Sequence, residues 1–212
     1  MIENCRTKSL WLIMFMSVLI MLSPNISSAD DNNFYIGVTG QGTPFLTGNA
    51  DKQLDTMYKD AFGVGWGVGV EGGYRFAEFF SVQVGVGYEK YVGSTFEGRT
   101  FDDLNIIPIY GGGKFHILTN KFLLDPYIRL DLGAARLNSV ESTYNGLKYK
   151  NWNDSWTFLL DAGAGLEVHL EPVGLFIEVK GRYLGSPDAL SSLGDADSSW
   201  TLPINLGVRY YF

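Results

Sequence analysis

Residues 62–76 (FGVGWGVGVEGGYRF) alternate at period two between two kinds of side chain. Even-numbered positions carry aromatic or branched apolar residues, interrupted only by Gly72. Odd-numbered positions carry glycine, Glu71 or Arg75. Successive side chains of an extended strand point to opposite faces, whereas helical faces repeat every 3.6 residues. The stretch is therefore predicted to be a β-strand with one apolar face and one polar or glycine-rich face.

The same alternation recurs along the chain and predicts eight strands. The segments lie near 33–41, 62–76, 80–91, 104–117, 123–137, 156–170, 175–184 and 200–212, and they run 9 to 15 residues. Strands of soluble proteins usually have about 5–6 residues, whereas a tilted strand that crosses a bilayer needs about 9–11. Segment length therefore favours strands that span a membrane.

The connections alternate between short and long. Those at 77–79, 118–122 and 171–174 are short, and those at 42–61, 92–103, 138–155 and 185–199 are long and polar. Short periplasmic turns and long outer loops are typical of outer-membrane barrels. The predicted fold is all-β: an eight-stranded antiparallel up-and-down transmembrane β-barrel, with both chain ends on the periplasmic side.

Aromatic side chains gather at the two ends of the apolar face, as in the interfacial girdles of such barrels. We expect Phe34, Tyr74, Phe76, Phe80, Phe115, Tyr210 and Phe212 at the periplasmic ends. We expect Phe62, Trp66, Tyr88, Trp156, Tyr183 and Trp200 at the outer ends. Because proline cannot donate to a strand ladder, Pro108 and Pro203 are expected at the rim or at bulges.

The first 29 residues read as a signal peptide, and residues 30–212 as the barrel domain. A weakly basic start precedes the apolar run Leu10–Leu22, and the small residues 27–29 offer a cleavage site. This run of thirteen residues, apolar except for Ser17, is too short for a membrane-anchor helix, which needs about 20. Cys5, the only cysteine, lies in this segment. We expect export through the periplasm and insertion into the cell outer membrane.

The inward face is predicted to carry a lumen polar network. Its members are Glu71, Arg75, Glu89, Lys114, His116, Asp125, Arg129, Asp131, Asp161, Glu167, His169, Glu178, Lys180, Arg182 and Arg209. Acids and bases nearly balance, and eight strands enclose room for little more than side chains. We expect a paired plug, with a narrow gated water path as the alternative.

Glycines on the second and third strands also face inward. They are Gly63, Gly65, Gly67, Gly69, Gly85 and Gly87. Missing side chains there are expected to admit Glu178, Lys180 and Arg182 from the opposite wall, because a large void would forfeit packing contacts. A cavity is the alternative.

Two constellations resemble chemical sites. Ser81, His116 and Asp125 should lie near the periplasmic ends of adjacent strands, as a nucleophile, base and orienting acid would. His116, Asp125 and His169 form a possible metal ligand set. We interpret both as parts of the polar plug and expect no catalytic, cofactor or metal site. The acidic last loop (Asp188, Asp195, Asp197) is expected to be solvated, with divalent-cation contact as the alternative.

The chain resembles the outer-membrane β-barrel family of OmpA-type, OmpX-type and OmpW-type proteins. The resemblance covers residues 30–212 and ends on Leu206, Val208, Tyr210 and Phe212, which resemble the signal read by the barrel-assembly machinery. It implies that machinery, outer-membrane lipid and lipopolysaccharide as partners, besides an unknown surface ligand. No segment resembles the His-Tyr-Ser-Asn type of the lipid A deacylases.

Charge excludes one further class of partner. Without residues 1–29, which hold Glu3, Arg6 and Lys8, the 23 acidic and 16 basic residues become 22 and 14, a net charge of −8. An acidic chain without a basic patch argues against nucleic acid. The expected function is non-enzymatic and structural or surface-interacting through the outer loops. The alternatives are a small porin-like channel or conduit for small or apolar solutes, and a lipid-modifying enzyme.

Overall fold

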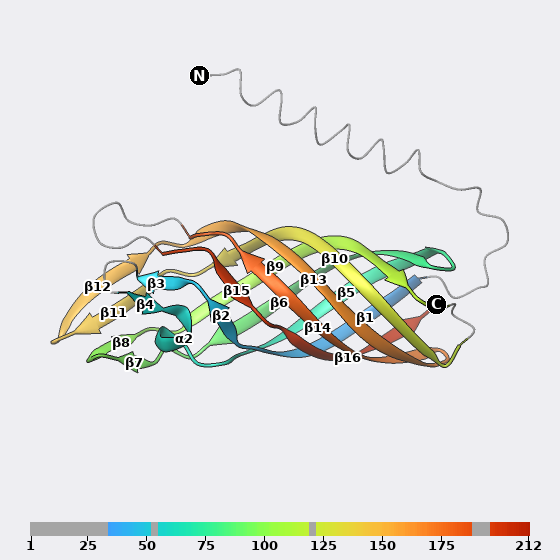
Figure 1. Ribbon diagram of the computed structural model, residues 1–212, viewed down its shortest axis with the longest axis horizontal. Coiled ribbons are helices and arrows are strands. Elements are labelled where there is room, and N and C mark those ends of the chain that lie inside the picture. The colour runs from blue at the N-terminus through green and yellow to red at the C-terminus, as the bar shows by residue number, and fades with distance from the viewer. Residues whose placement is uncertain (1–33, 52–54, 119–121, 188–195) are drawn as a thin grey trace, which may run out of the picture. The chain divides into compact units, whose positions relative to one another are not determined.

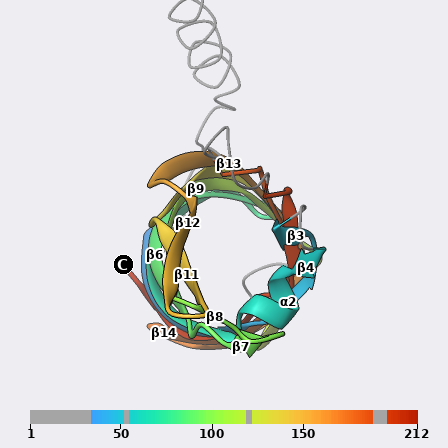
Figure 2. The same cartoon turned by 90° about the vertical axis from the view of Figure 1, so that its left-hand side faces the viewer.

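The computed structural model describes residues 34–51, 55–118, 122–187 and 196–212, so the expected signal peptide (1–29) lies outside the described residues. Eight long strands form a barrel (Figures 1 and 2): β1 (Phe34–Thr43), β5 (Gly65–Ala77), β6 (Phe80–Tyr91), β9 (Leu104–His116), β10 (Leu124–Leu137), β13 (Ser155–Leu170), β14 (Val173–Leu184) and β16 (Ile204–Tyr211). Each pairs antiparallel with its neighbours, and β1 pairs with β16 to close the ring. The predicted fold class is confirmed.

The outside of the barrel is apolar and its inside is polar. Val38 on β1 lies opposite Val70 of β5 and Val208 of β16, and these three valines are 41–55% exposed. Glu71 and Arg209, each one residue further along its strand, are at most 4% exposed. Water-soluble proteins bury their valines and expose their charges. The reversed arrangement, with every strand paired around the ring, is the one that hydrocarbon allows.

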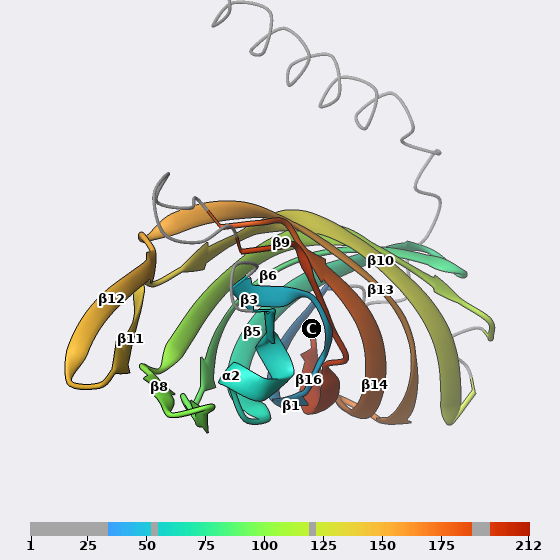
Figure 3. The same cartoon turned by 60° about the vertical axis from the view of Figure 1, so that its left-hand side comes forward.

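The barrel has two unlike ends. At the short-turn end, β5 joins β6 through Glu78 and Phe79, and β13 joins β14 through Glu171 and Pro172; β1 begins and β16 ends there. The loop end carries β2 (Phe45–Thr47), β3 (Asn49–Asp51), β4 (Thr56–Met57), α2 (Tyr58–Ala61), β7 (Thr95–Phe96), β8 (Arg99–Phe101), β11 (Val140–Tyr144), β12 (Leu147–Trp152) and β15 (Ser199–Thr201). The strands β12, β11, β8 and β7 form one sheet, which we call the outer sheet (Figure 3).

The loop end also contains a hydrophobic core, which the polar composition of the loops did not predict. Phe45, Tyr58, Phe62, Phe101 and Trp152 from the loops pack with Tyr91, Leu104, Ile106, Leu137, Leu159 and Leu184 from the strands. All of them are at most 7% exposed. We call this cluster the apolar cap.

The apolar cap corrects one prediction. Phe62 was expected in the outer girdle, but β5 begins only at Gly65, and Phe62 is 2% exposed. Its ring lies 6.0 Å from that of Phe101 and 6.2 Å from that of Trp152. Phe62 has the even-numbered parity of the outward residues of β5, but it lies before the strand begins, directly after α2. Its side-chain direction therefore does not follow the alternation of the strand.

The other expected girdle residues lie on the outer face. Trp66, Tyr88, Trp156 and Trp200 are exposed towards the loop end, and Tyr183 is half-buried against Trp200. Pro203 lies between β15 and β16. Pro108 lies inside β9, opposite a lapse of the β6–β9 pairing at Gly87 and Tyr88. Among the described residues, no helix is long and apolar enough to cross a membrane.

The β11–β12 turn provides a local test of the outer sheet. Asn145 (φ +50°) and Gly146 (φ +78°) form its two central residues, both in the left-handed region. A side chain costs about 1–2 kcal/mol in that conformation. We expect Gly146→Ala to raise hydrogen exchange of the β11–β12 amides about 5–30-fold. Asn145→Gly is the matched control and should leave exchange nearly unchanged; equal rates in Gly146→Ala and the parent would contradict the turn geometry.

Candidate functional site

The lumen holds the charged residues that the alternation assigned to it. Strand parity points all fifteen inward, and fourteen of them are buried; His169, near the short-turn end, is partly exposed. Their contacts show how they are held.

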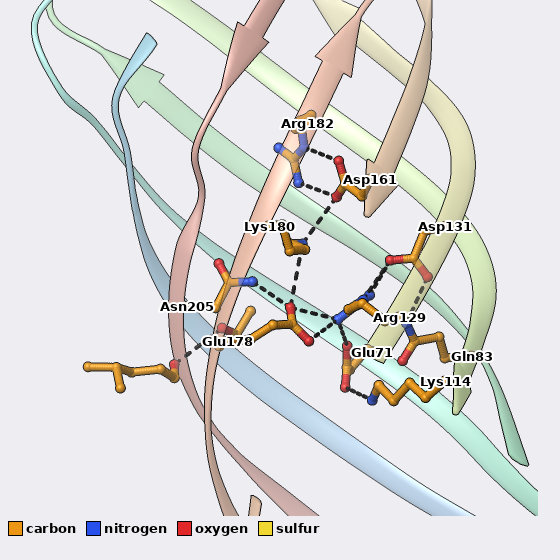
Figure 4. A network of polar contacts seen from close by, with 12 residues as sticks. Glu71, Gln83, Lys114, Arg129, Asp131, Asp161, Glu178, Lys180, Arg182 and Asn205 are labelled. Atoms are coloured by element: carbon orange, nitrogen blue, oxygen red, sulfur yellow. Dashed lines mark hydrogen bonds and ion pairs between the residues drawn. The ribbon is translucent and has the colours of Figure 1, made fainter. Parts of the chain in front are cut away.

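Glu71 and Arg129 lie at the centre of the lumen network (Figure 4). Glu71 Oε1 accepts from Arg209 Nε at 2.8 Å and from Lys114 Nζ at 3.1 Å, and Arg129 Nη1 lies 3.4 Å from Oε2. Arg129 Nη1 also donates to both oxygens of Glu178 at 2.8 Å. One acid from β5 thus joins bases from β9, β10 and β16.

The network extends towards both ends of the barrel. On the loop side, Arg182 donates to Asp161 Oδ1 and Oδ2 at 2.7 and 2.9 Å, and Lys180 Nζ lies 3.1 Å from the same acid (Figure 4). Arg182 also contacts Glu89. Towards the short-turn end, Arg209 pairs with Glu167. Charges buried this way are tolerated because each has hydrogen-bonded partners of opposite sign.

Little space is left between these side chains. A cavity of about 10 Å³ lies beside Gly69, Gly87 and Pro108, opposite Glu178 and Lys180. That volume holds roughly one water molecule. The apolar cap lies on the loop side of the lumen, where bulky side chains from the loops and the strands pack together.

The atoms nearest to the six inward glycines belong to neighbouring segments, and at two of the six they are aromatic rings, which corrects the expectation of charged side chains from the opposite wall. A Cβ at Gly65 would lie 2.4 Å from the Tyr91 ring, and one at Gly85 equally close to Tyr110. Only Gly69 and Gly87 border the cavity that Glu178, Lys180 and Arg182 also line. Each ring lies over the glycine of a neighbouring strand, because a neighbour is closer than the opposite wall.

Lumen aromatics were missed by the sequence analysis. They are Tyr35, Tyr110, Tyr127 and Phe176, all at most 7% exposed. Arg209 lies 3.7 Å from the centre of the Phe176 ring, and Lys114 lies 4.7 Å from that of Tyr35. Strand parity alone could have found them: Tyr110, Tyr127 and Phe176 share parity with the inward charges of their strands, and Tyr35 follows the outward Phe34.

The Ser81, His116 and Asp125 side chains meet near the short-turn end. Ser81 Oγ lies 2.9 Å from His116 Nε2, and His116 Nδ1 lies 2.7 Å from Asp125 Oδ2. Arg75 Nη1 donates to the same oxygen at 3.1 Å, and the Arg75 guanidinium also binds the Glu78 and Leu118 carbonyls. The three residues form the serine–imidazole–carboxylate relay whose inward placement the sequence predicted.

The His116, Asp125 and His169 side chains are poorly arranged to bind a metal ion. His116 Nδ1 and His169 Nε2 both contact Asp125 Oδ2, at 2.7 and 3.3 Å, with the Arg75 cation on that same atom. A divalent ion would lie beside a guanidinium. Within the described residues, no group of three ligating side chains is arranged for a metal. Of the acidic last loop, Asp188 and Asp195 lie outside the described residues, and Asp197 donates its N–H to the Asn49 carbonyl.

A closed ring of eight antiparallel strands, apolar outside and charged inside, defines an integral outer-membrane β-barrel protein. The sequence model of the family described as "Outer membrane protein beta-barrel domain" matches residues 13–212. The chain therefore belongs to that family. No curated protein sequence matches it.

Solved structures of small outer-membrane barrels share the fold. Neisserial surface protein A (NspA) is 16% identical with a TM-score of 0.54, covering 84% of this chain and 97% of its own. OprG from Pseudomonas aeruginosa is 12% identical with a TM-score of 0.54, covering 87% and 98%. The attachment invasion locus protein Ail of Yersinia pestis, in complex with the heparin analogue sucrose octasulfate, is 16% identical with a TM-score of 0.52, covering 86% and 100%.

Proposed function

We propose that this outer-membrane protein is a closed, non-conducting barrel that acts at the cell surface through its loop end. The observation that carries the proposal is the contrast between the two parts of the molecule. The lumen is occupied by ion pairs and covered by the apolar cap, whereas the loops form the ordered outer sheet. Ordered strands with exposed side chains suit recognition, while a filled lumen does not suit transport.

The outer sheet offers a defined surface for contact. Its β11–β12 turn places Tyr144 (43% exposed) and Leu147 (61% exposed) beside the exposed Lys148. Apolar side chains with adjacent charge are a frequent composition of protein interaction sites. Two of the similar barrels are named for attachment and for the surface, which agrees with such a role for this chain.

Orientation is tested by cysteine labelling of intact cells. The chain's only cysteine is Cys5, so Cys5 is the only native thiol that could be labelled besides an introduced cysteine. We expect Tyr144→Cys, at the loop end, to react with a membrane-impermeant maleimide. Glu171→Cys is the matched control at the short-turn end, where the residue is also exposed, and should stay unlabelled until the outer membrane is permeabilised. The reverse pattern would place the outer sheet in the periplasm and end the proposal.

The surface role is tested by removing the hairpin tip. We expect cells whose residues 143–148 are replaced by a Gly-Ser turn to lose surface attachment while dye exclusion by the outer membrane stays normal. Unchanged attachment to every surface tried would contradict the proposal.

The alternative is a small channel or a conduit for apolar solutes, favoured by the cavity beside Pro108 and the lapse of the β6–β9 pairing there. Purified protein in planar bilayers distinguishes the two functions. We expect no discrete conductance steps under conditions in which an open porin conducts, because roughly one water fits the cavity. Reproducible steps, or uptake of a small solute into vesicles, would favour the channel.

A further inference from the structure

The serine relay at the short-turn end is not used by a surface role. Ser81 on β6, His116 on β9 and Asp125 on β10 come from three consecutive strands of the ring. Their hydrogen bonds of 2.9 and 2.7 Å run through the two different nitrogens of one imidazole. An imidazole bonded in this way accepts the serine proton at Nε2 while Nδ1–H donates to the carboxylate, which is the geometry of an activated nucleophile.

Ser81 lies between two basic residues of the neighbouring strands. In register, Ser81 lies directly opposite Arg75 of β5 on one side and Lys114 of β9 on the other. Directly opposed residues have Cβ atoms about 4.5–5.5 Å apart. The charged groups of both basic residues are held by other partners: the Arg75 guanidinium lies on Asp125 Oδ2, and Lys114 Nζ donates to Tyr35 and Glu71. Arg75 thus fixes the carboxylate that orients His116.

We propose that Ser81 is a nucleophile for small carboxylic esters that enter from the short-turn end, with His116 as its base and Asp125 positioning His116. Ser81 Oγ bonds to the carbonyl carbon, and its proton passes to His116 Nε2. The ester C–O bond breaks, the departing alcohol takes that proton, and the acyl group stays on Ser81 until water releases it. Entry is from the mouth where the His169 side chain is 12% exposed.

Asp125 contacts two histidines, which provides a matched pair of variants. His116 and His169 bind the same carboxylate oxygen, but only His116 also reaches Ser81. A purely structural network would respond to the loss of either histidine. A nucleophilic serine responds to the loss of His116 alone.

The experiment treats the folded, full-length barrel in detergent with a small alkyl fluorophosphonate. The Ser81 oxygen bonds to phosphorus, the P–F bond breaks, and fluoride leaves with the proton. Mass spectrometry of the digest identifies the modified residue and measures the rate of modification. The gel mobility of the unheated protein shows whether the barrel is folded. We expect one adduct, on Ser81, and none with Ser81→Ala.

We expect His116→Gln to slow the labelling about 100-fold or more, in line with the usual contribution of a general base, and His169→Gln to stay within a few-fold of the parent. Asp125→Glu, which keeps the carboxylate, should retain more of the rate than Asp125→Asn. With p-nitrophenyl acetate, the parent should release nitrophenol in a Ser81-dependent phase. Absence of a Ser81 adduct in folded protein, or equal rates in His116→Gln and the parent, would overturn the proposal. Neither result bears on the surface role, which does not involve this end of the barrel.

Discussion

Glu71→Gln should lower the free energy of unfolding by about 3–5 kcal/mol, the usual loss when one partner of a buried ion pair is removed. Glu71 is contacted by Lys114, Arg129 and Arg209 and is 4% exposed. The amide keeps the shape of the side chain but leaves these cations with one anion fewer. Equilibrium urea unfolding of the barrel in lipid vesicles, followed by tryptophan fluorescence, measures the change.

Glu141→Gln is the control for this experiment. Glu141 lies 3.6 Å from Lys148 in the outer sheet, and both side chains are well exposed. Exposed pairs contribute about 0–1 kcal/mol, so the control should unfold almost as the parent does. If both substitutions lowered the free energy of unfolding equally little, the lumen charges would be hydrated. The closed barrel would then be contradicted, and with it the proposed function that depends on it.

Leu130→Arg should destabilise the protein in a bilayer by about 2–4 kcal/mol, the cost of a cation on the lipid face near the midplane. Leu130 lies near the middle of β10, points outward and is 54% exposed. Leu124→Arg is the matched control, with the same substitution on the same face at the first residue of the strand, where it is 48% exposed. Near the interface the cost falls to about 0–1 kcal/mol.

Unfolding from vesicles of defined thickness measures both variants. The depth dependence is the informative quantity, because a protein that folds in water would tolerate both arginines equally on an exposed surface. Equal effects at positions 130 and 124 would show that hydrocarbon does not contact β10.

The serine relay depends on strand register, which the sequence predicts only in part. The alternation points Ser81, His116 and Asp125 inward, and short turns make their strands neighbours. Whether Ser81 Oγ reaches His116 Nε2 depends on the register of β6 against β9, in which Ser81 lies opposite Lys114. A slip of one residue would turn one member to the lipid face.

The sequence by itself determined the barrel, its eight strands and the charged side chains inside it. Side-chain direction in a strand has a period of two, and the segments are as long as a bilayer-spanning strand needs to be. Only the tertiary structure decided which charges pair, since Glu71 and Arg209 are brought together by a sheet that closes on itself. It also decided the apolar cap. Phe45, Tyr58 and Trp152 lie in short elements outside the eight long strands, and they gather only because the strands bring these elements to one end of the barrel.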